Sequence, residues 1–90
     1  MNIFIYVRER IPYALDEIED ALGASLEGIG DVTGSGTGVA GSNFDIEIED
    51  ESVDPATAIA RIREGLRPFD LPPSSVAVVN GTEFRLVSPD

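Results

Sequence analysis

The sequence contains no cysteine, histidine, lysine or tryptophan, and these absences exclude several kinds of site. Without histidine or cysteine, a zinc, copper or iron–sulfur centre has almost no ligands. Without histidine or lysine, the hydroxyls of Ser35, Thr37 and Ser42 lack the usual partner that activates a nucleophile. We therefore expect a protein that is not an enzyme and that holds neither a metal nor a cofactor.

Long hydrophobic runs are also missing. No apolar stretch approaches the roughly 18 residues that a membrane-spanning helix needs. The first residues, MNIFIYVRERIP, carry their charges after the apolar part, which is the reverse of a secretory signal. The sequence therefore predicts a cytoplasmic protein, and the lack of cysteine agrees without deciding the compartment.

Acidic residues dominate the charge. Seventeen aspartates and glutamates stand against six arginines, for a formal net charge of −11. Such a chain repels nucleic-acid phosphates and anionic membranes, so neither is expected as a partner. Two explanations stay open: a partner protein with a basic surface, or a role in solubility or in a saline cell.

Hydrophobic spacing predicts a strand followed by a helix in the first quarter of the chain. Residues 2–7 alternate and are apolar on both faces, which is typical of a central strand. From Ile11 to Leu22 the apolar spacing becomes helical, with Pro12 in the first turn and Gly23 at the end. The outer side of this helix is acidic, with Asp16, Glu17, Glu19 and Asp20.

Three further elements follow the glycine-rich segment. Residues 43–50 alternate as a half-buried strand whose apolar side begins with Phe44. Asp54 and Pro55 suit the N-cap and first residue of a second helix, which Pro68 ends. Asn80-Gly81 lies between two short apolar runs and predicts a tight hairpin.

With a second strand between the first helix and residues 43–50, the order is β-α-β-β-α-β, and the hairpin adds a final strand. Two helices on one face of an antiparallel sheet resemble the ferredoxin-like arrangement. We therefore expect one α+β domain covering residues 1–90. The resemblance concerns architecture, and this fold supports many unrelated functions.

The glycine-rich segment, residues 34–41, contains a formal G-x-G-x-x-G match from Gly36 to Gly41. A dinucleotide site needs this motif to open a helix, but here a strand follows. A phosphate loop is excluded as well, because no Gly-Lys-Ser/Thr is present.

Glycines alternate through this segment, so an extended chain would have one face of nearly bare backbone. A flexible turn between two strands, or close packing of the backbone, is the favoured explanation. A ligand or close-approach site is the alternative, and its candidate residues are Gly34, Gly36, Gly38 and Gly41.

Carboxylates recur on one side of the predicted strand. Same-face residues of a strand are roughly 6.5–7 Å apart, too far to chelate one ion without a neighbouring strand. We therefore predict a protein-binding surface rather than a metal site. Its candidate residues come from the helix and from the strand: Asp16, Glu17, Asp20, Asp45, Glu47 and Glu49.

These features predict a non-catalytic interaction module that binds a basic protein. In charge and architecture the chain is similar to immunity proteins and inhibitors, small acidic α+β proteins that cover the basic groove of a nuclease. A second hypothesis is a self-associating regulatory domain, a homodimer that binds a small molecule in the glycine segment. A third is an enzyme that uses carboxylates, although every acid lies in a solvated pattern.

Overall fold

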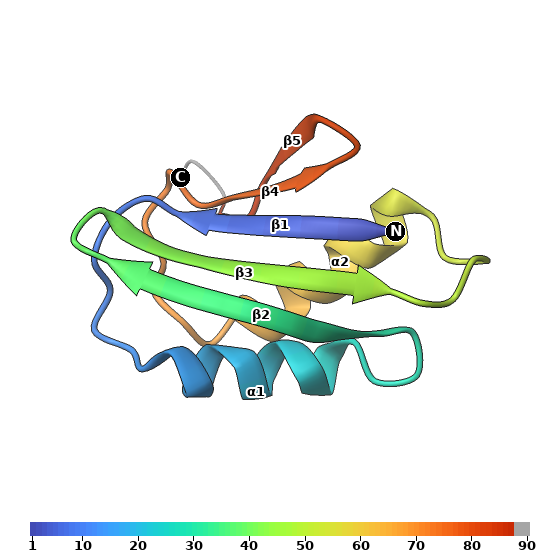
Figure 1. Ribbon diagram of the computed structural model, residues 1–90, viewed down its shortest axis with the longest axis horizontal. Helices are drawn as coiled ribbons and strands as arrows, with labels where there is room; N and C mark the ends of the chain where they lie inside the picture. Colours follow the sequence, from blue (N-terminus) through green and yellow to red (C-terminus); the bar gives the residue numbers. More distant parts are fainter. Residues whose placement is uncertain (88–90) are drawn as a thin grey trace.

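The computed structural model describes residues 1–87, which form two helices and a five-stranded antiparallel sheet with the order β2-β3-β1-β4-β5 (Figure 1). The elements in chain order are β1 (Asn2–Val7), α1 (Leu15–Ser25), β2 (Gly30–Gly38), β3 (Gly41–Ile48), α2 (Pro55–Leu66), β4 (Val76–Val79) and β5 (Thr82–Arg85).

This arrangement confirms the predicted α+β, ferredoxin-like fold with one extra strand. Strands β1 and β2 are joined through α1 but lie on either side of β3, and β3 and β4 are joined through α2 on either side of β1. The extra strand β5 follows the predicted hairpin. Both turn residues adopt positive φ, 52° at Asn80 and 80° at Gly81, as a tight two-residue hairpin requires.

The core lies between the helices and one face of the sheet. Its fully buried large side chains come from both helices, their connections and the two central strands: Ile3, Ile5, Val7, Ile18, Leu22, Leu26, Phe44, Ile46, Ile59 and Ile62. Strand β1 is central, as predicted. Its second apolar face is not buried, however, because Phe4 and Tyr6 point away from the helices and are each 40% exposed.

Helix α2 begins as predicted. The Asp54 carboxylate accepts a hydrogen bond from the Thr57 N–H at 2.8 Å, and Pro55 is the first helical residue. Further along, a Cβ at Gly65 would lie only 2.6 Å from the Ser25 hydroxyl of α1. The missing side chain therefore lets the two helices approach closely.

Helix α1 begins at Leu15, so the predicted start near Ile11, with Pro12 in the first turn, is wrong. A contact distant in sequence keeps the preceding residues outside the helix. The Tyr13 hydroxyl accepts a hydrogen bond from the Asp70 N–H at 2.9 Å, which ties this segment to the connection between α2 and β4.

The same helix ends at Ser25, beyond the predicted stop at Gly23. A Cβ at Gly23 would meet nothing within 4 Å, so no contact requires glycine there. The chain reverses instead at Gly28, whose φ of +87° favours a residue without a side chain.

Residues 34–38 of the glycine-rich segment belong to strand β2 and are not a turn; the turn between β2 and β3 lies at Val39 and Ala40. A bulge at Thr33 also changes which face the glycines of β2 occupy. Before the bulge Gly30 opposes Ile48 on the helix side, whereas after it Gly34 opposes Asp45 on the other side. The predicted continuous bare face is therefore divided between the two sides of the sheet.

Close approach of backbone occurs at the ends of β2 and its hairpin. At Gly41, φ is +138° and a Cβ would overlap the Val7 carbonyl oxygen. At Gly30 a Cβ would overlap the Glu47 carbonyl oxygen. Gly38, by contrast, has open space around it, so glycine is not sterically required there.

Candidate interaction surface

One face of the sheet carries no helix. In Figure 1, α2 lies behind the sheet and α1 runs along its lower side, below β2. The uncovered side is called the open face here, and strand pairing places alternate residues of each strand on it. Its central residues are Phe4, Tyr6, Asn43, Asp45, Glu47 and Val78.

Phe4 and Tyr6 form the apolar centre of the open face. Both belong to β1, the middle strand, and each is 40% exposed. Phe4 is paired with Val78 of β4 on one side and with Asp45 of β3 on the other. The aromatic pair therefore lies between an apolar strand and a polar, acidic one.

Strand β3 supplies the acidic border of this face. Asp45 is half-buried, and its Oδ2 lies 3.3 Å from the point where a Cβ of Gly34 would be. In the same way, the Oδ1 of Asn43 lies 3.1 Å from the point where a Cβ of Gly36 would be. The bare glycines of β2 therefore give these polar side chains room at the edge of the sheet.

The sequence-predicted acids lie on two different sides of the molecule. Asp45 and Glu47 are on the open face, and Glu49 follows the end of β3, where its N–H donates to the Ile29 carbonyl at 2.8 Å. The remaining three, Asp16, Glu17 and Asp20, lie on the exposed side of α1. The structure does not bring all six onto one face.

Glu19 differs from its predicted place on the outer side of α1. It is half-buried and accepts a hydrogen bond from the Ser35 hydroxyl of β2 at 2.6 Å. The sequence interpretation also missed Phe4 and Tyr6 as surface residues. A usable signal was present, since a helical layer on only one face leaves the alternate residues of β1 exposed.

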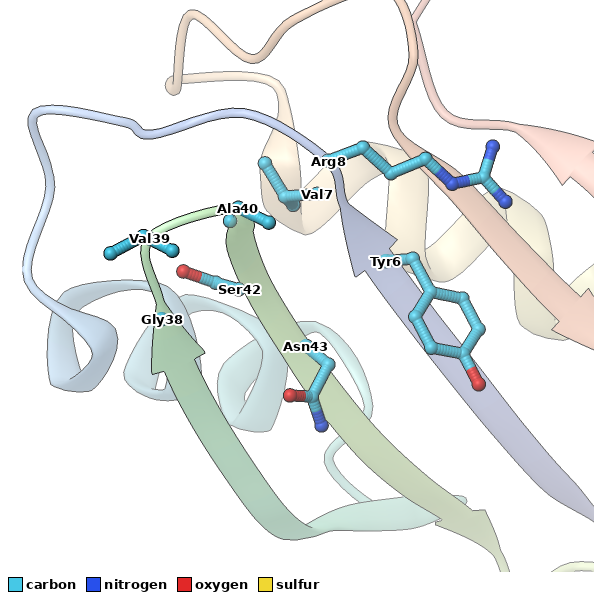
Figure 2. Close-up of a pocket in the computed structure, with 9 residues that line it drawn as sticks. Tyr6, Val7, Arg8, Gly38, Val39, Ala40, Ser42 and Asn43 are labelled. Carbon is cyan, nitrogen blue, oxygen red and sulfur yellow. The ribbon is translucent and has the colours of Figure 1, made fainter.

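A shallow depression of 460 Å³ lies beside the β2–β3 hairpin, at the end of the open face (Figure 2). Its lining includes Tyr6, Arg8 and the turn residue Val39, which is 91% exposed. The Ser42 hydroxyl donates to the Thr37 hydroxyl at 3.3 Å, and Arg8 pairs with Glu83 at 3.1 Å. Hydroxyls and one ion pair thus lie around this depression.

The two carboxyls with altered titration lie elsewhere. Hydrogen bonds from Ser52 lower the pKa of Asp50, and hydrogen bonds from Thr57 lower the pKa of Asp54. Both precede α2 and serve local structure. In residues 1–87, no three carboxylates gather in a way that would hold a metal ion. None of the helices in this range is long and apolar enough to cross a membrane.

Comparison with known proteins gives no family to which these features belong. Neither a protein-family model, nor a curated protein, nor a solved structure matches the chain. The open face and its charge are therefore the features that bear on function.

Proposed function

We propose that this protein is a non-catalytic interaction module whose open face binds a basic protein. The observation that carries the proposal is the exposed pair Phe4 and Tyr6 beside the carboxylates of Asp45 and Glu47. Aromatic side chains bury a large area at little entropic cost and are common anchors of interfaces. Carboxylates around such an anchor steer and select partners of opposite charge.

The net charge of −11 supports a partner with a basic groove. In an inhibitor of the immunity type, carboxylates occupy the positions that nucleic-acid phosphates take in the groove of a nuclease. Affinity would then fall steeply with salt, since exposed charges are screened within about 10 Å at 0.1 M ionic strength.

The proposal is tested by capture at low salt, elution with a sodium chloride gradient, and titration of the purified candidate by calorimetry. Two variants alter the open face: Phe4→Ala with Tyr6→Ala, and Asp45→Lys with Glu47→Lys. Each is expected to weaken binding roughly tenfold or more, because anchors and their charged neighbours carry most of the binding energy.

A matched control reverses two exposed charges away from the open face, Glu51→Lys with Glu64→Lys. Since it changes the net charge by the same amount, equal weakening in this control would show non-specific attraction and refute the proposal. Gly38→Ala tests the small-molecule hypothesis, because this position has free space and tolerates a methyl group. If Gly38→Ala lost binding of the captured partner while both open-face variants kept it, a ligand at the hairpin would be favoured.

A further inference from the structure

The two free edges of the sheet are built differently. Edge strand β5 has four residues, and the Arg63 guanidinium donates two hydrogen bonds to the Arg85 carbonyl, at 2.9 and 2.6 Å. Edge strand β2 has nine residues and contains neither lysine nor proline, two of the usual means of blocking an edge. The molecule thus covers an acceptor at one edge, whereas at the other edge Ser35 and Thr37 are exposed even though α1 runs alongside β2.

The direction of the main chain along β2 follows from the pairing of β3. The Ile48 N–H donates to the Met1 carbonyl at 2.7 Å, and the Met1 amino group donates to the Ile48 carbonyl at 2.9 Å. The N–H and C=O groups of the even-numbered residues of β3 therefore point towards β1. The main chain of the odd-numbered residues of β3 therefore faces β2, where Gly41, Asn43 and Asp45 oppose the glycines at 38, 36 and 34. The N–H and C=O groups of Ser35 and Thr37 consequently point to the free edge.

Carboxylates border this edge on both faces of the sheet. On the helix side, Glu19 accepts from the Ser35 hydroxyl at 2.6 Å. On the open face, Asp45 lies beside the bare Gly34. Asp31, on β2 itself, is exposed and belongs to the same border. Acids from both faces of the sheet, Glu19 and Asp45, therefore border one edge.

Building on the proposed function, we propose that β2 accepts an extended segment of the basic partner as an additional strand. Such a segment would bond to the outward main chain of Ser35 and Thr37. Its side chains would alternate between the open face, where a long one can reach Asp45 across the bare Gly34, and the helix side, where Glu19 lies. Lysine or arginine at these positions is the chemistry that the edge selects.

A second copy of this chain fits the edge poorly. Pairing β2 with β2 of another copy would bring Asp31, Asp45 and Glu19 of both molecules together, and like charges across strands are destabilising. Each copy also carries a net charge of −11. A basic segment removes this repulsion, so it is the occupant to which the charge pattern points.

The probe is a synthetic decapeptide that repeats Arg-Arg-Val-Val, so that arginines lie on both faces of the added strand, and it is titrated into ¹⁵N-labelled protein at low salt. Binding should slow the exchange of the Ser35 and Thr37 amides and leave the amides of β5 unchanged. A second peptide of the same sequence is N-methylated at every residue, which keeps its charge but removes the N–H donors from both edges of the strand. It should bind at least about tenfold more weakly.

On the protein side, Thr37→Pro removes one outward N–H, and proline is tolerated at such edge positions. It should weaken binding of the first peptide about tenfold, whereas the control Thr37→Val should not. The exchange measurement on the unmodified protein supports the inference independently, in case Thr37→Pro does not fold.

Three outcomes overturn the inference. Equal binding of both peptides, with shifts confined to Phe4 and Tyr6, would mean that the open face binds without strand addition, and the proposed function would survive. If the first peptide did not bind, the edge of β2 would not be a binding site for basic segments. A dimer that Thr37→Pro abolishes in sedimentation would make a second copy the occupant.

Discussion

At the scale of single residues, the hydroxyl of Ser75 is the group whose burial is least compensated. Ser75 is 0% exposed, and its Oγ has no hydrogen-bond partner among residues 1–87. An unsatisfied buried hydroxyl costs about 1–3 kcal/mol. We therefore expect Ser75→Ala to raise the free energy of unfolding by about 1 kcal/mol, measured by urea denaturation.

The neighbouring Ser74→Ala is the control for this change. The Ser74 hydroxyl donates to Glu9 at 3.3 Å in an exposed position, so its removal should change stability by less than about 0.5 kcal/mol. A lower stability of Ser75→Ala than of the unmodified protein would contradict the prediction.

Residue patterns in the sequence predicted which side chains form the core, but not which polar groups meet. Phe44 and Ile46 are buried as their alternation predicts. The Glu19–Ser35 contact depends on how α1 lies against β2, and no local pattern encodes that distance. The exposure of Tyr6 has the same origin, since it depends on which face the helices leave uncovered.

At the scale of elements, Asp54 links the stability of α2 to pH. Its carboxylate is hydrogen-bonded by Thr57, so its pKa in the folded protein lies below the ordinary value of 3.8. The cap therefore contributes fully above that value and is lost as pH falls through the lower, folded pKa. Asp54→Ala should lower the melting temperature at pH 7, and this difference should vanish in strong acid.

Asp54→Asn separates charge from capping, because asparagine caps a helix well but does not titrate. Its melting temperature should stay above that of Asp54→Ala at every pH. A difference between the unmodified protein and Asp54→Ala that persists unchanged in strong acid would refute the assigned role of the carboxylate.

Element boundaries show where sequence reasoning succeeds. The start of α2 was predictable because Asp54 and Pro55 act through the neighbouring backbone. The start of α1 was not, since Tyr13 is held by Asp70, far along the chain. The predicted order of elements contains a second strand, but the glycine pattern favours a turn for residues 34–38, because glycine has little strand preference. Pairing with β3 supplies the order that these residues lack.

At the scale of the whole molecule, the net charge of −11 predicts that salt stabilises the fold. Repulsion among the acids destabilises the compact state, and ions screen it. The melting temperature should rise between low salt and about 0.2 M sodium chloride, where the screening length falls to about 7 Å. Calorimetry at several salt concentrations measures the effect.

The shape of that curve separates the two explanations of the acidity. A melting temperature that stops rising at about 0.2 M reflects simple screening of the acidic charges, and this fits an acidic surface kept for a partner. A rise that continues into molar salt would instead indicate adaptation to a saline cell. A fall in melting temperature with added salt would contradict the prediction that repulsion destabilises the fold.

The overall topology followed from the order of predicted elements, while the arrangement of acidic groups did not. A sequence gives the total charge of the protein, but binding depends on where each charged group lies in the structure. Only the structure separates Asp16 and Asp20 on α1 from Asp45 on the open face, and only it shows that β2 runs between these groups.

The central position of β1 has a consequence for how the protein folds while it is being synthesised. This strand precedes all the others in the chain, yet it pairs with β3 on one side and β4 on the other. A ribosome adds about 5–20 residues per second, so β1 waits seconds before residues 76–79 exist to pair with it. The innermost strand of the finished sheet thus keeps one edge unpaired until nearly the whole chain has been made.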